Sequence, residues 1–111
     1  MKKRTFNIGD ILGVYAAVNC PPNYMNGDVF VVYFMTGVDF FDYAYHDARF
    51  KCIAELERQL PWLKKVVVLE NYDDPKAVKE WYNKQVEMYG ELHEIVPFEN
   101  YNPVDQVGEE V

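Results

Sequence analysis

The sequence predicts a small α+β domain, in which three N-terminal helices pack on a small βαβ unit with a short, partly parallel sheet. Two observations indicate this fold class. Apolar side chains recur every three or four residues over much of residues 9–60, as in helices with one buried face. Farther along, two apolar runs at residues 65–69 and 92–96 enclose a helix with clear start and stop signals.

The first helix is expected at about residues 9–18. Its apolar side chains have helical spacing: Ile8, Ile11, Leu12 and Tyr15. Pro21 and Pro22 should stop the helix, because proline lacks the backbone N–H that a helix interior needs. Asn26 and Gly27 then form a turn signal.

The next segment, residues 29–35, is a run of seven apolar or aromatic residues. Its valines, tyrosine and phenylalanines favour a strand, and an Asn-Gly turn in front would suit a hairpin. In contrast, Asp28 can cap a helix, and Gly37 follows where a helix would end. Periodicity cannot decide for a short continuous apolar run, so the residues alone leave both structures open.

A third helix is expected from Asp39, which can act as its N-cap, to Pro61, which ends it. Its apolar face consists of Phe41, Tyr45, Ala48, Cys52, Leu56 and Leu60. The run at 65–69 that follows is β-branched and apolar on both faces, as strands in parallel sheets are.

The last helix has the strongest signals in the chain. Asp74 is the expected N-cap, Pro75 occupies the first helical position and Gly90 closes the helix. Its apolar face consists of Val78, Trp81, Tyr82 and Val86. Because strand–helix–strand units cross over with a right hand, the strands at 65–69 and 92–96 are expected to pair in parallel. A third strand could come from residues 5–8 or from residues 29–35.

Composition and charge restrict the kind of partner. The 111 residues suit a single domain, 1–111, with loosely ordered ends at 1–5 and 99–111. The net charge of −7 argues against direct binding to nucleic acid, which needs clustered lysine and arginine. It fits a protein partner with a basic surface, although acidity that only keeps the protein in solution is the ordinary alternative.

The two cysteines and the hydropathy pattern bear on location. Cys20 and Cys52 are isolated and lack metal-ligand spacing, which is typical of a reducing cytoplasm. The start of the chain is a poor match to an export signal, and no apolar run has the length of a membrane span. We therefore expect a cytoplasmic protein with no cofactor, no metal and no membrane contact.

Several motifs resemble those of a family of small uncharacterised proteins of bacteriophages and prophages. They are "NIGDILGV", "GDVFVVYFMTGVDFF", "PWL", "MYGELHEIVPF" and "NPVDQV", and together they cover roughly residues 5–107. The resemblance implies a helix ending in Met-Thr-Gly, and hence a helix at 29–35. It also implies a phage context and thus the host cytoplasm. The family's histidine soon after this motif is replaced by Asp42-Tyr43, with His46 the nearest histidine, and the family offers no activity to transfer.

The candidate partner-binding surface combines rings and acids from two segments. On the third helix, away from its apolar face, the residues are Asp42, Tyr43, His46, Asp47 and Phe50. In the acidic turn after the strand at 65–69 they are Glu70 and Asp73. Tyrosine gives contact area at low entropic cost, and carboxylates suit a partner's arginine or lysine. The ordinary alternative is an amphipathic helix whose extra aromatic residues pack beneath the tail.

No catalytic motif is present, so the predicted function is a non-enzymatic, acidic phage accessory protein. It would bind a host or phage protein, for example as an inhibitor of a host nucleic-acid-handling or defence enzyme. A second possibility is a small-ligand, metal-binding or enzymatic module, using the acidic turn 70–74 or Cys20 with His46 or His93. A third is a structural component that assembles as a homo-oligomer.

Overall fold

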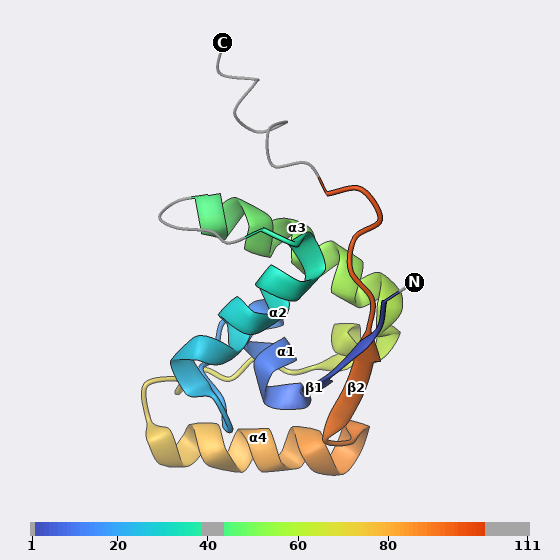
Figure 1. Ribbon diagram of the computed structural model, residues 1–111. Helices are drawn as coiled ribbons and strands as arrows, with labels where there is room; N and C mark the ends of the chain where they lie inside the picture. Colours follow the sequence, from blue (N-terminus) through green and yellow to red (C-terminus); the bar gives the residue numbers. More distant parts are fainter. Residues whose placement is uncertain (1, 39–43, 102–111) are drawn as a thin grey trace.

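The computed structural model describes residues 2–38 and 44–101. Over these residues the chain forms four α-helices, two 3-10 helices and one two-stranded sheet (Figure 1). In chain order they are β1 (Arg4–Asn7), α1 (Ile8–Tyr15), η1 (Tyr24–Asn26), α2 (Gly27–Thr36), α3 (Ala44–Gln59), η2 (Pro61–Lys65), α4 (Pro75–Tyr89) and β2 (Leu92–Ile95). Within the described ranges, no helix is both long enough and apolar enough to cross a membrane.

The predicted α+β fold with a partly parallel sheet is wrong. The sheet described has two strands, and β1 pairs antiparallel with β2, with Arg4 opposite Ile95 and Asn7 opposite Leu92. Residues 1–5 were expected to form a loosely ordered end, but Arg4 and Thr5 lie in β1. The segment expected as a strand at 65–69 is instead split between η2 and an extended coil.

Three interactions explain why the expected parallel pair does not form. First, β1 occupies an edge of β2. Second, the side-chain amide of Gln59 donates to the Val96 carbonyl and accepts from the Val96 N–H, both at 2.9 Å, so this backbone is already bonded. Third, the indole N–H of Trp81 donates to the Val67 carbonyl at 2.8 Å, where a sheet would need a backbone donor. Local β propensity was therefore a poor guide to pairing.

Helix α1 lies at the centre of the fold and contacts all three other helices (Figure 1). Every residue from Ile8 to Val14 is buried. Asn7 caps its N-terminus by accepting a hydrogen bond from the Gly9 N–H at 2.8 Å, and the Tyr82 hydroxyl of α4 donates to the same oxygen. This one side chain therefore joins β1, α1 and α4.

The segment at 29–35 is helical, which confirms the interpretation that the resemblance favoured. Val31, Val32 and Met35 are buried, whereas Phe30 is 41% exposed, so the helix buries one face and not its whole circumference. Gly37 ends α2 in the left-handed conformation, with φ of 73°, which glycine adopts without the cost of a Cβ.

Helices α3 and α4 bury the faces that their spacing predicts. Ala48, Cys52 and Leu56 of α3 are fully buried, and Val78, Trp81 and Tyr82 of α4 are buried as well. Asp74, Pro75 and Gly90 have the predicted capping roles, and the Asp74 carboxylate accepts from the Lys76 N–H at 3.0 Å. The expected start of the third helix, with Asp39 and Phe41, lies outside the described residues.

Candidate functional site

The loop between α1 and η1, residues 16–23, is flanked by two hollows that share Asn19 as a lining residue. The first, which we call the tyrosine hollow, has a volume of about 380 Å³. It is lined by Asn19, Pro21, Tyr24, Tyr72, Asp73, Pro75, Val78 and Lys79. The second, the arginine hollow, has about 200 Å³ and is lined by Gly13, Ala17, Asn19, Asp28, Tyr45, His46 and Arg49.

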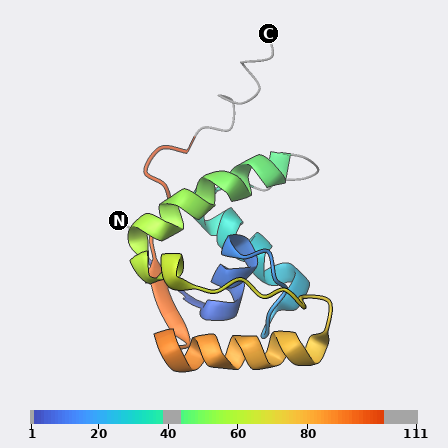
Figure 2. The same ribbon diagram turned by 180° about the vertical axis from the view of Figure 1, so that it is seen from behind.

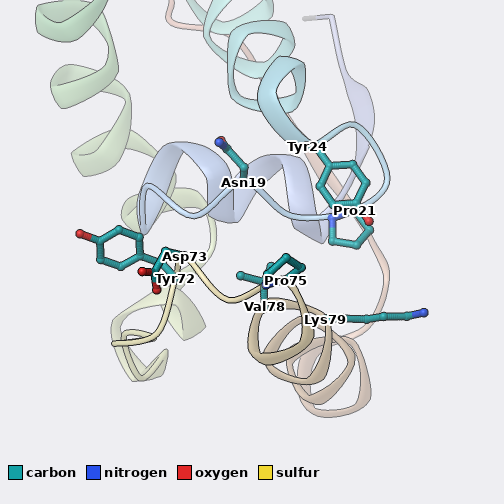
Figure 3. Close-up of a pocket in the computed structure, with 8 residues that line it drawn as sticks. All are labelled: Asn19, Pro21, Tyr24, Tyr72, Asp73, Pro75, Val78 and Lys79. Atoms are coloured by element: carbon teal, nitrogen blue, oxygen red, sulfur yellow. The ribbon is translucent and has the colours of Figure 1, made fainter.

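The tyrosine hollow has aromatic and apolar walls with a carboxylate at one side. Figure 3 shows Tyr72 and Asp73 on one side of it, and Pro21 and Tyr24 on the other. Tyr24 is 54% and Tyr72 68% exposed, so both rings offer area to a partner. The amine of Lys79 points away from Tyr72 and Asp73 (Figure 3), which leaves the carboxylate without a neighbouring cation among the hollow's residues.

The arginine hollow is more polar and is held by a partly buried hydrogen bond. The Tyr45 hydroxyl of α3 donates to the Asp28 carboxylate of α2, which joins the two helices. Burial, followed by this hydrogen bond and the negative charge of Asp28, raises the pKa of Tyr45, so it stays protonated as the donor. Arg49 completes the hollow, and its guanidinium lies 5.9 Å from the centre of the Phe50 ring.

The backbone around the loop is strained at two positions. Ala17 and Tyr24 have φ of 58° and 48°, in the left-handed region that side chains other than glycine adopt at a cost of roughly 1 kcal/mol or more. Ala17 lines the arginine hollow and Tyr24 lines the tyrosine hollow. Strain of this kind gathers at functional sites, where the surrounding structure compensates for it.

A buried carboxylate lies near the same loop. Asp10 of α1 is 4% exposed; one of its oxygens accepts from the Asn23 amide at 2.9 Å, and the other has no hydrogen-bond partner in the described structure. Desolvation raises the pKa of Asp10 above the usual 3.8, against the lowering effect of the Asn23 hydrogen bond, and the charge of Asp28 raises it further.

Replacing this carboxylate should stabilise the protein. The folded protein keeps the Asp10 proton in a pH range, starting near 3.8, where the unfolded chain has lost it. The contribution of Asp10 to stability therefore falls as the pH rises through that range. Asp10→Asn keeps an acceptor for Asn23 and has no charge, so we expect it to raise the free energy of unfolding at pH 7 by about 1 kcal/mol.

Urea denaturation of both proteins at pH 4 and pH 7 checks this prediction. The advantage of Asp10→Asn over the wild type should be smaller at pH 4, where more of the Asp10 side chain is protonated in both states. A variant that is less stable than the wild type by the same amount at both pH values would show that the charged carboxylate is favourable in the fold.

The structure places the predicted binding residues at different positions relative to this loop. His46 lines the arginine hollow and Asp73 the tyrosine hollow, so residues from the two predicted segments meet around Asn19. Asp47, Phe50 and Glu70 are exposed but line neither hollow. The remaining two, Asp42 and Tyr43, lie outside the described residues.

Seven further residues of this surface were not singled out from the sequence: Gly13, Ala17, Asn19, Tyr24, Arg49, Tyr72 and Lys79. A weak signal was present for the tyrosines. Each follows an asparagine in a turn-like segment next to proline or acidic residues, in "PPNYMNG" and "ENYDDP". A tyrosine in such a segment has little opportunity to be buried, so these two rings were candidates for exposure.

The contacts of Cys20 do not support a nucleophile there. Its side chain is 1% exposed and its thiol donates to the Val18 carbonyl at 3.3 Å. Burial, with a smaller effect of the Asp10 charge, raises the pKa of Cys20 to about 12, so the reactive thiolate is scarce at neutral pH. His93 instead lies against Trp62, with ring centres 4.8 Å apart. In the described part of the chain, no group of three His, Cys, Asp or Glu residues could hold a metal ion.

Comparison with known proteins gives no family for the chain: no family model, no curated protein and no solved structure matches it. The class of protein therefore has to be argued from the surface around residues 17–24.

Proposed function

We propose that the protein is a binding module, and that it recognises a protein partner through the two hollows that flank the loop at residues 16–23. The observation that carries the proposal is that residues from α1, α3, the acidic turn and α4 meet around one strained loop. Two exposed tyrosines and a carboxylate of the tyrosine hollow offer contact area and charge to a partner.

The tyrosine hollow favours a basic side chain of the partner. An arginine or lysine entering it would meet the Asp73 carboxylate and could lie against the face of Tyr72 or Tyr24. The net charge of −7 would also attract a partner with a basic surface from a distance. The arginine hollow, with Arg49 and His46, would accept a polar or acidic group of the same partner.

The biological setting belongs to the same proposal. The resemblance to phage proteins favours a role in the cytoplasm of an infected bacterium. There, an acidic protein that occupies the basic surface of a host nucleic-acid-handling or defence enzyme would inhibit it. A phage protein with a basic surface is the other kind of partner that this chemistry allows.

A capture experiment with matched variants tests the proposal. Tagged protein is incubated with bacterial lysate after nuclease treatment, and the bound proteins are identified by mass spectrometry. We expect one basic protein to be retained, and Asp73→Lys to reduce its capture by about tenfold or more, because charged and aromatic anchors contribute most of the binding energy. Tyr72→Ala should reduce capture in the same direction.

Glu94→Lys is the matched control for Asp73→Lys. It makes the same charge change at an exposed position of β2 that lines neither hollow. It should leave capture close to the wild-type level. Equal losses with Glu94→Lys and Asp73→Lys would mean that only overall charge matters, and loss of the partner after nuclease treatment would mean that nucleic acid bridges the two proteins.

A further inference from the structure

Residues 66–70, which follow η2 on the way to α4, belong to no helix or strand and pair with no strand in the described structure. Val66 has extended φ and ψ of −68° and 129°. Val67 and Val68 are 76% and 67% exposed, although valine strongly prefers buried, sheet-like surroundings. Within residues 2–38 and 44–101, residues 67–70 make no hydrogen bond to another backbone group. Figure 2 shows the segment running alongside α4 with no strand beside it.

One side of this segment is fixed to the fold, and the other is open. The Val67 carbonyl accepts from the Trp81 indole, and Val66 and Leu69 pack against the core. Val68 is exposed, and residues 67–70 make no backbone hydrogen bond within the described residues. The structure thus presents an open stretch of backbone beside exposed valines, of the kind that proteins normally cover.

The charges on either side of the segment have opposite signs. Lys64 and Lys65 precede it, and Glu70 follows it; all three are exposed. An antiparallel pairing of two identical segments places the lysine end of each copy against the acidic end of the other. A parallel pairing would place like charges together. The segment is therefore complementary to itself in the antiparallel direction.

We propose that two copies of the chain associate through this edge, as antiparallel strands at residues 66–70 with Val68 at the two-fold axis. A symmetric antiparallel pair must place some residue opposite its own copy, and Val68 is the central residue of 66–70 and has an exposed side chain. The pairing supplies the missing backbone partners and covers Val67 and Val68. It uses a surface other than the two hollows, so it does not depend on the proposed function.

An apolar hollow next to the segment adds to the surface that a second copy would cover. It has a volume of about 460 Å³ and is lined by Val67, Trp81, Met88 and Tyr89, together with Lys65, Lys84 and Gln85. Met88 is 59% exposed. Exposed apolar side chains beside an unpaired edge are typical of association surfaces, and the basic and acidic ends form a polar rim around them.

Substitution of Val68 by a charge tests the two-fold axis directly. Light scattering after gel filtration should show the wild type passing from monomer to dimer as its concentration rises. Val68→Asp should weaken the dimer by about tenfold or more, because the two new carboxylates face each other across the axis. Val68→Lys should do the same, whereas Val68→Thr, which remains β-branched and uncharged, should still form the dimer.

Mixing the two charged variants gives the decisive measurement. An equimolar mixture of Val68→Asp and Val68→Lys should form a heterodimer, identified by its mass in native mass spectrometry, because opposite charges now meet at the axis. Residue 68 is exposed, so both variants should fold, which circular dichroism checks. A wild type that stays monomeric at every concentration would overturn the proposal. So would a dimer unaffected by Val68→Asp, or a mixture that yields no heterodimer.

Discussion

Gly9→Ala is expected to destabilise the protein by about 3 kcal/mol or more. A Cβ at this position of α1 would overlap the carbonyl oxygen of Pro21 and lie 2.9 Å from a ring carbon of Tyr82. The first of these atoms is backbone, so a side-chain rotation cannot relieve the overlap. Either α1 or the loop before η1 has to move, and both belong to the buried centre of the fold. Urea denaturation followed by circular dichroism measures the loss.

Gly13→Ala, one turn farther along the same helix, is the matched control. Its Cβ would lie 3.3 Å from the Asp28 side chain, which requires only a small adjustment. Alanine is favoured over glycine in a helix by about 1 kcal/mol, which offsets much of the cost. We therefore expect a change within about 1 kcal/mol. Equal losses from the two variants would mean that the close approach at Gly9 is not what makes glycine necessary there.

The structural features that the sequence predicted well depend on neighbouring residues. The cap at Asp74, the stop at Gly90 and the buried face of α4 each depend on residues a few positions apart. The run at 29–35 was harder, because a continuous apolar segment has no periodicity to separate helix from strand. The resemblance indicated the helix there. Residues alone could not show that Val31, Val32 and Met35 face the core while Phe30 faces outward.

The features that could not be predicted depend on partners distant in the sequence. Arg4 pairs with Ile95, and nothing near either residue reveals the other. The expected strand at 65–69 had the composition of a strand. However, the Trp81 indole N–H donates to the Val67 carbonyl, and β1 occupies an edge of β2. The sequence grouped His46 and Asp73 in one candidate surface, but the finding that they line two hollows that share Asn19 required the tertiary structure.

Trp81→Ala is expected to cost about 3–5 kcal/mol in unfolding free energy, the usual range for removing a buried tryptophan. The Trp81 side chain is 9% exposed, and it lines two hollows, one together with Val67 and the other together with Leu69. Its indole N–H is also the donor to the Val67 carbonyl. Loss of the ring therefore leaves a cavity beside the segment and frees the Val67 carbonyl. Urea denaturation measures the loss.

Trp81→Phe separates the hydrogen bond from the ring. It keeps most of the apolar volume and should cost about 1–2 kcal/mol, with lower backbone NMR order parameters at residues 67–72 and unchanged ones in α1. Because the segment leads into Tyr72 and Asp73, loosening it should weaken partner capture and dimer formation together. Asp73→Lys should affect capture alone, and Val68→Asp dimer formation alone. If Trp81→Phe leaves the order parameters at residues 67–72 unchanged, the segment is held by other contacts and is not positioned by Trp81.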